Sequence, residues 1–323
     1  MAAQLFPPRH VYFPSNPSHT STVILLHDTN STGAELAAAL AVSTPTATGK
    51  SKSETIFEHF PSCRWVFPSA QPRQIDTCYA SKGNWINVDI DIEATTSSDA
   101  DTNEDADANA DADSQQPQPQ VQPSPSAEAK DDDENENKDQ NLEACVEYIL
   151  QIVEEEVGRL GGDSRRVVLG GFGQGMAVAI ATLLTARRRL GGFVGVSGWV
   201  PFVEGIEGLG GRGRGWLAED EARMGPSEGS SGVDGVEVNS EAGEALLETP
   251  VLLSYLEDDP CVDTRTGLTA YETLNRLGFV KVVWDPRPGS QQGENWLLDA
   301  SQLDTIVDFL AEVFCGEEQH LCS

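Results

Sequence analysis

One stretch of the chain, residues 165–184 (RRVVLGGFGQGMAVAIATLL), limits the fold more than any other. It begins with the apolar, β-branched run Val167 to Leu169, which is typical of a strand buried in a parallel sheet. Four of the next six residues are glycine, so the chain is expected to turn sharply there. Met176 to Leu184 is rich in alanine and leucine and contains no helix breaker, which predicts a packed helix.

The same alternation of strands and helices recurs along the chain. Further apolar runs predict strands at residues 22–26, 64–67, 192–196, 249–256 and 281–284. Helices are predicted at residues 34–40, 141–160, 266–277 and 301–314. Strands that alternate with helices favour an α/β fold, with a mostly parallel central sheet and helices on both faces.

Two segments depart from this pattern. Residues 93–140 contain 15 acidic and 2 basic residues and almost no large apolar side chain, so we expect a disordered acidic insertion. Residues 205–243 are rich in glycine and mixed in charge, which indicates a mobile loop. Because closure entropy grows only with the logarithm of loop length, one domain over residues 1–323 can carry both. The acidic segment is interpreted as a solvated spacer or, alternatively, as a contact for a basic partner.

The composition excludes several classes of protein. With a formal net charge of −31, the chain is a poor partner for nucleic acid or for an anionic membrane. No apolar run approaches the roughly 20 residues of a membrane helix, and no apolar segment follows a basic start as in a secretory signal. The six cysteines lack the spacing of a metal site, and most are expected to be reduced core residues. We therefore predict a cytoplasmic protein without a metal or an organic cofactor, and the sequence leaves its oligomeric state open.

The glycine-rich turn has the spacing G-x-x-x-G from Gly171 to Gly175, with Gly173 at its centre. α/β-Hydrolases place their nucleophile at the centre of such a strand-to-helix turn. The segment Gly-Phe-Gly-Gln-Gly resembles the Gly-Phe-Ser-Gln-Gly of the acyl-protein thioesterase and small carboxylesterase family. Residues 197–201 (SGWVP) and 258–262 (DDPCV) resemble two further segments of that family. The resemblance implies an α/β-hydrolase sandwich outside the two insertions.

The resemblance also implies where a catalytic triad would lie. Hydrolases of this fold use a serine, an acidic residue and a histidine, in that chain order. The matching positions hold Gly173, Asp259 and Asn295. Glycine has no side chain with which to attack, and an asparagine amide is not a useful base near neutral pH. Two of the three roles are therefore vacant, and the triad is interpreted as degenerate.

Other positions of the family's site are matched in part. Thr29 and Gln174 stand where the family supplies two backbone N–H groups to an oxyanion, although Asp28 replaces a glycine of that loop. Trp85 resembles a tryptophan near the family's pocket, and it is equally well explained as a core residue. His27 ends a predicted strand, and we interpret it as a structural histidine bonded to nearby backbone.

Three functions remain open from the sequence. The first is a non-hydrolytic or strongly impaired homologue that binds acyl or ester ligands, either small molecules or an acylated protein. The second is a cyclase or isomerase on the same fold, with Asp28, Asp259 and Glu294 as candidate acids or bases. The third is an active esterase or thioesterase with an unrecognised nucleophile, Ser197 or Ser290, although a serine at a strand end usually bonds locally. A histidine close to such a serine would favour the third function.

Overall fold

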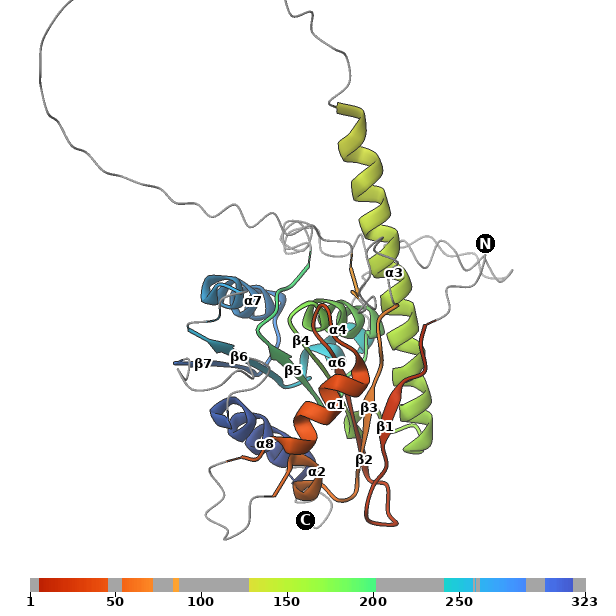
Figure 1. The fold of residues 1–323 in the computed structure, drawn as a ribbon, viewed down its shortest axis with the longest axis vertical. Helices are drawn as coiled ribbons and strands as arrows, with labels where there is room; N and C mark the ends of the chain where they lie inside the picture. Colours follow the sequence, from red (N-terminus) through yellow and green to blue (C-terminus); the bar gives the residue numbers. More distant parts are fainter. Residues whose placement is uncertain are drawn as a thin grey trace, which may run out of the picture.

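The computed structural model contains a seven-stranded sheet in the order β1-β3-β2-β4-β5-β6-β7 (Figure 1). It describes residues 6–45, 54–71, 84–86, 128–201, 241–257, 259, 262–288 and 300–315. Neighbouring strands run parallel except β1, which pairs antiparallel with β3 at one edge. The strands are β1 (His10–Tyr12), β2 (Ser21–Leu26), β3 (Cys63–Phe67), β4 (Val167–Phe172), β5 (Gly192–Val196), β6 (Val251–Leu256) and β7 (Val282–Arg287).

This sheet confirms the predicted α/β fold class. Strands β2 to β5 are buried along their whole length because helices cover both faces of the sheet. Strand β7 continues beyond the predicted 281–284 and passes through Pro286. Proline lacks the N–H that an inner strand needs, so it is tolerated here because β7 lies at the edge of the sheet.

Helices pack on both faces of the sheet, and side chains alternate between two cores along each strand. In β2, Ile24 and Leu26 face one core, whereas Val23 and Leu25 face the other. On the first face lie α3 (Glu128–Arg159), α4 (Gln174–Ala186), α6 (Glu241–Leu247) and α7 (Thr264–Leu277). On the second face lie α1 (Gly33–Val42), α2 (Ile56–His59) and α8 (Ala300–Cys315). A short 3-10 helix, η1 (Ser164–Arg166), leads into β4.

Capping residues fix the bounds of two helices. The Thr32 hydroxyl accepts a hydrogen bond from the Glu35 N–H at the start of α1, at 3.2 Å. The Asp263 carboxylate accepts from the Arg265 N–H at the start of α7, at 2.8 Å. Gly278 ends α7 with a φ of 98°, which glycine adopts without strain.

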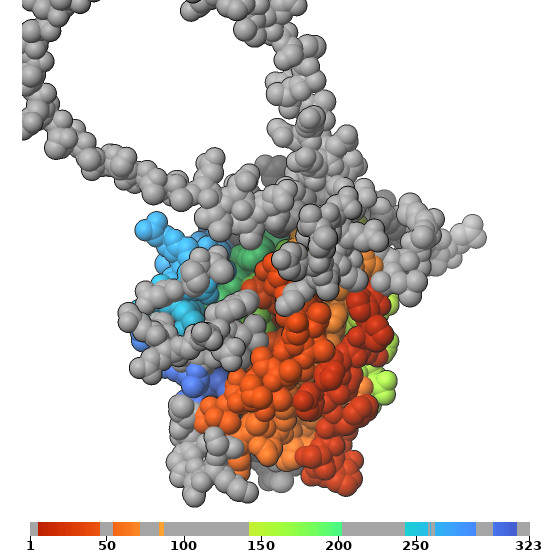
Figure 2. Space-filling model, viewed as in Figure 1, coloured from red at the N-terminus to blue at the C-terminus, as the bar shows by residue number. Residues whose placement is uncertain are grey.

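The described residues between 6 and 71, coloured red to orange, cover much of the face seen in Figure 2. Cys63 and Cys145 are buried and unbridged, as expected of core cysteines. Within the described ranges, no helix combines the length and the apolar character that crossing a bilayer requires.

The helix predicted at 141–160 is longer than expected. Helix α3 begins at Glu128, inside the segment predicted to be disordered, and its first turns extend away from the body (Figure 1). That boundary was wrong because a charged composition prevents burial but not helix formation, and Glu, Lys, Gln and Ala all favour helices. Helix α6 likewise begins at Glu241, within the predicted mobile loop.

Several predicted features lie outside the described residues and stay predictions. They are the remainder of the acidic segment (93–127), the loop at 205–240, and the site positions Ser290, Glu294 and Asn295.

Candidate functional site

The sharp turn between β4 and α4 holds the position predicted for a nucleophile. Gly173 has a φ of 50° and a ψ of −118° there, a conformation that residues with a side chain adopt only under strain. Its N–H donates to the carbonyl oxygen of Val196, the last residue of β5, at 2.9 Å. The turn thus lies at the carboxyl edge of the sheet, where open parallel sheets bind their ligands.

The first and last glycines of the G-x-x-x-G segment, Gly171 and Gly175, are required by close packing. A Cβ on Gly171 would collide with the backbone of Gly175 and would lie 2.6 Å from Met176 N. A Cβ on Gly175 would collide with the His27 carbonyl and would lie 2.6 Å from the carbonyl oxygen of Leu26. The G-x-x-x-G spacing therefore lets α4 begin directly against β4 and the end of β2, with or without catalysis.

We expect Gly175→Ala to lower the free energy of unfolding by about 3 kcal/mol, because the added methyl group meets backbone atoms that cannot move aside. Gly158 in α3 is a matched control, since nothing lies within 4 Å of a Cβ built there. Gly158→Ala should stabilise the protein by about 0.5–1 kcal/mol. Urea denaturation measures both variants, and destabilisation of similar size in the two would contradict the packing argument.

The carboxylate of Asp28 lies at the centre of the candidate site. Its Oδ1 atom accepts hydrogen bonds from two backbone N–H groups, that of Thr29 at 2.7 Å and that of Gln174 at 2.9 Å. A Cβ built on Gly173 would overlap the same carboxylate. One side chain of the protein thus engages both N–H groups and fills the space into which a side chain at position 173 would point.

The acidic side chains of Asp28 and Asp259 lie close to each other in this site. Burial raises the pKa of the Asp28 carboxyl, the N–H groups of Gln174 and Thr29 lower it, and the charge of Asp259 raises it. Asp259 follows β6, and its Oδ1 atom accepts a hydrogen bond from the Val262 N–H at 3.1 Å. The two aspartates are therefore close enough for their charges to repel.

A buried scaffold holds residues 84–86 against the turn. The Gln174 side chain accepts a hydrogen bond from the Trp85 N–H at 2.6 Å and donates one to the Ile86 carbonyl at 2.8 Å. Trp85 is fully buried, and its indole N–H donates to the His27 carbonyl at 2.8 Å. These contacts favour the interpretation of Trp85 as a core residue, and its predicted contact with a ligand stays a prediction.

His27 is buried and neutral. Its Nε2 atom accepts a hydrogen bond from the Ala70 N–H at 3.0 Å, so Nδ1 carries the proton and donates to the Asp28 carbonyl at 2.6 Å. Burial is the main cause that lowers the pKa of this imidazole to about 4. Because backbone groups engage both ring nitrogens, His27 is structural, as the sequence favoured, and it offers no free nitrogen to act as a base.

Between pH 6.5 and about 4, His27 is expected to reduce the free energy of unfolding by up to about 3 kcal/mol. In that window the unfolded chain protonates the imidazole while the folded chain keeps it neutral, so stability rises with pH. The raised pKa of Asp28 acts in the opposite direction above pH 3.8. Urea midpoints of wild type and of the His27→Gln variant, measured across this pH range, isolate the His27 contribution. As the pH is lowered, the midpoint of the variant should fall less than that of wild type. Parallel curves would contradict the assignment.

Ser197 lies beside the turn, directly after β5. Its φ of 45° is unusual for a residue with a side chain, and its N–H donates to the Ser254 carbonyl at 3.1 Å. Among the histidines that the structure describes, His27 is the one at the carboxyl end of a central strand, and its nitrogens are engaged. The others lie in β1, before β2 and in α2 (His10, His19 and His59). The described residues therefore offer Ser197 no imidazole base.

Sequence reasoning missed the contact made by Asp28. It treated the residue as a replacement for a glycine and as a candidate acid or base, not as a side chain that accepts hydrogen bonds from two backbone N–H groups. A signal was present, because Asp28 directly precedes one residue predicted to bind an oxyanion through its backbone. A carboxylate placed there can satisfy such donors itself.

The parallel sheet and the sharp turn after its central strand define an α/β-hydrolase fold. The model of the phospholipase/carboxylesterase family matches residues 126–208. An acyl-protein thioesterase 1 of Gibberella zeae is 28% identical over 150 residues, which cover 46% of this chain and 50% of that protein. Carboxylesterase SOBER1 of Arabidopsis thaliana is 34% identical over 106 residues, 33% of this chain and 42% of that protein.

A solved structure has a similar fold. The crystal structure of Zea mays acyl-protein thioesterase 2 matches with a TM-score of 0.53 at 15% identity, and the match covers 96% of this chain and 100% of that one. The chain thus has an α/β-hydrolase fold and is similar in part of its sequence to acyl-protein thioesterases and carboxylesterases. It spans about half the length of the first fungal thioesterases that it matches in sequence.

Proposed function

We propose that this protein is a non-hydrolytic or strongly impaired relative of the acyl-protein thioesterases and carboxylesterases that binds acyl or ester ligands, either small molecules or an acylated protein. The observation that carries the proposal is the contact of the Asp28 carboxylate with the N–H groups of Thr29 and Gln174. The proposal includes a cytoplasmic location, which rests on the sequence alone.

The first support comes from the positions aligned with the triad. Gly173 has no hydroxyl to attack an ester, and Asn295 has no imidazole to take the proton. Loss of the nucleophile or of the base alone costs about 10⁶ in turnover, and losing both costs little more because the residues act as a unit.

The second support comes from the occupied N–H groups. In ester hydrolysis, free donors stabilise the negative oxygen of the tetrahedral intermediate, and removing one costs about 10² to 10³ in turnover. Here both donors bind a carboxylate of the chain itself, and the intermediate would have to displace it. We therefore expect that even the residual catalysis of an oxyanion hole is suppressed.

The same carboxylate favours a second candidate function, proton transfer in a cyclisation or isomerisation. Burial and the charge of Asp259 raise the pKa of Asp28 although the N–H groups of Gln174 and Thr29 lower it, and a raised pKa favours proton exchange between a carboxyl group and substrate. Asp28→Asn would abolish such a reaction, because the amide neither accepts nor donates that proton.

The test is to assay wild-type protein with p-nitrophenyl acetate and with the octanoyl thioester of N-acetylcysteamine. Ordinary enzymes turn over at about 1 to 10³ s⁻¹, so a loss of about 10⁶ predicts a turnover below about 10⁻³ s⁻¹. Because the thioester should survive, calorimetry can compare its binding with that of the acetyl thioester, and the longer chain should bind more tightly. A turnover of about 1 s⁻¹ would overturn the proposal, and absence of octanoyl thioester binding would overturn its ligand part.

A further inference from the structure

A cavity lies at the edge of the sheet opposite the candidate functional site. It has a volume of about 440 Å³, and Phe13, His19, Arg64 and Arg159 are among its lining residues. His19 precedes β2, Arg64 lies near the start of β3, and Arg159 ends α3. These residues stand at the amino ends of the parallel strands, whereas the candidate functional site stands at the carboxyl ends.

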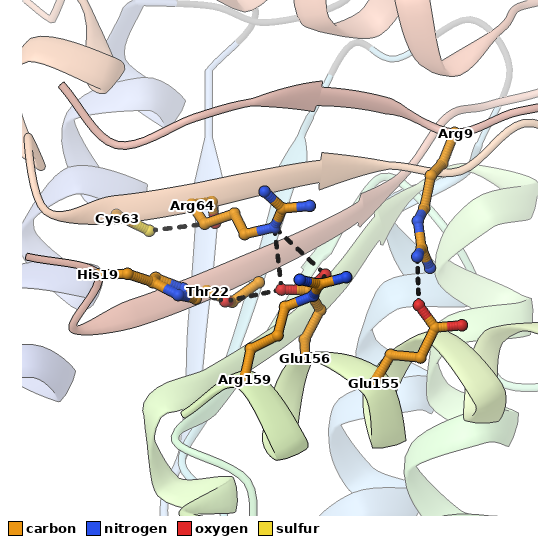
Figure 3. Close-up of polar contacts among 8 residues, drawn as sticks. All are labelled: Arg9, His19, Thr22, Cys63, Arg64, Glu155, Glu156 and Arg159. Atoms are coloured by element: carbon orange, nitrogen blue, oxygen red, sulfur yellow. Dashed lines mark hydrogen bonds and ion pairs between the residues drawn. The ribbon is translucent and has the colours of Figure 1, made fainter. Parts of the chain in front are cut away.

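A buried carboxylate holds the two arginines of this cavity. Glu156 is fully buried in α3, and its carboxylate forms ion pairs with Arg64 Nε at 3.1 Å and with Arg159 Nε at 3.3 Å. The Thr22 hydroxyl donates to the same carboxylate at 3.3 Å, and His19 Nε2 lies 2.9 Å from that hydroxyl. Figure 3 shows this chain of contacts, with the guanidinium groups of the two arginines on the same carboxylate.

The arrangement leaves positive charge in the cavity. Two guanidinium groups share one carboxylate through their Nε atoms, and the described residues supply no second carboxylate to either of them. His19 adds no charge near neutral pH, because burial lowers its pKa and the two arginines lower it further, although Glu156 raises it. A net positive cavity stands out on a chain whose formal net charge is −31.

The cavity also has an apolar wall. The guanidinium carbon of Arg64 lies 4.8 Å from the centre of the Phe13 ring, a cation–π contact that fixes the guanidinium plane. Phe13 itself is 73% exposed, so part of its surface remains accessible to the apolar part of a ligand. The Arg64 side chain is 90% buried, so its orientation is set by Glu156 and Phe13 before any ligand arrives.

We propose that this cavity binds an organic oxyanion, a phosphate monoester or a carboxylate carried on an apolar group. The terminal Nη atoms of Arg64 and Arg159 donate to the anion, since guanidinium groups match the geometry of phosphate and carboxylate oxygens. The apolar part of the ligand packs against Phe13. This site is separate from the acyl site proposed above, and neither proposal depends on the other.

Calorimetry with phenyl phosphate, benzoate and inorganic phosphate tests the inference. Phenyl phosphate or benzoate should bind more tightly than inorganic phosphate, and the stronger of the two identifies the natural anion. Arg159→Gln should weaken that binding at least about tenfold, as expected for the loss of charge-assisted hydrogen bonds. Phe13→Ala should weaken the binding of phenyl phosphate more than that of inorganic phosphate, because only phenyl phosphate loses an apolar contact in addition to the support that Phe13 gives to Arg64. Addition of the ligand should also shift the NMR signals of the His19 imidazole.

Arg166 provides a closely matched control. Its Nε atom pairs with Asp163 three residues away at 3.1 Å, and its side chain is 47% exposed, against 50% for Arg159. Arg166 does not line the cavity, so Arg166→Gln should change the affinity by less than about twofold, as expected for a screened surface charge. Equal losses in the two variants, or no binding at 10 mM ligand, would overturn the proposal. Inorganic phosphate that binds as tightly as phenyl phosphate would overturn its apolar part.

Discussion

Changing Asp28 to Gly, Gly173 to Ser and Asn295 to His together is expected to raise hydrolysis of p-nitrophenyl acetate at least about 10³-fold above wild type. The serine and the histidine restore the attacking hydroxyl and its base at the aligned positions. The glycine at position 28 frees the N–H groups of Thr29 and Gln174 for the developing oxyanion.

The same geometry predicts that two of these changes are not enough. With Asp28 retained, a Cβ at position 173 overlaps its carboxylate, so the Gly173→Ser, Asn295→His double variant should stay close to wild type in activity. The matched control for the triple variant carries Ala in place of Ser at position 173, which keeps the backbone change but supplies no nucleophile. A double variant as active as the triple would contradict the role given to Asp28. A folded but silent triple variant would contradict the alignment of Asn295.

Glu156→Gln is expected to lower the free energy of unfolding by about 3–5 kcal/mol. The carboxylate has no exposed surface and neutralises Arg64, which is itself nearly buried, so its loss leaves an uncompensated charge in the interior. Glu155 is the matched control one residue earlier, because it pairs with Arg9 at the surface with half of its side chain exposed. Glu155→Gln should cost less than about 1 kcal/mol.

Urea denaturation of the two variants and of wild type decides between these expectations. If both variants shift the urea midpoint by a similar amount, the buried ion pair of Glu156 contributes no more to stability than the exposed ion pair of Glu155, and the prediction is wrong. A second comparison uses Arg64→Met with Glu156→Leu, which removes both charges and should recover most of the lost stability.

The sequence could predict most of the sheet because inner parallel strands are continuous apolar runs. The segment GFVGV, for example, forms β5 at the predicted bounds. The start of α3 was missed because hydrophobic periodicity marks only the turns of a helix that touch the core. Residues 128–140 of α3 lack that periodicity, yet their helix propensity is sufficient to continue it.

The position of the sharp turn could be predicted from the sequence, but the hydrogen bonds that the Asp28 carboxylate makes there could not. The G-x-x-x-G spacing located the turn, and the aligned residues Thr29 and Gln174 do bring their N–H groups to one atom. The atom is Oδ1 of Asp28, and its place depends on the rotamer of this side chain where the neighbouring strands β2 and β4 end. Residue spacing in a sequence does not predict a rotamer. The cavity beside Glu156 was equally hidden, because Phe13, Arg64 and Arg159 meet only through tertiary packing.

The overlap between Asp28 and a side chain at position 173 also couples these two positions, which lie far apart in the sequence. In this backbone, a serine at position 173 and the observed placement of the Asp28 carboxylate exclude each other. The effects of Gly173→Ser and Asp28→Gly on stability and activity should therefore be non-additive, because each substitution changes what the other side chain meets.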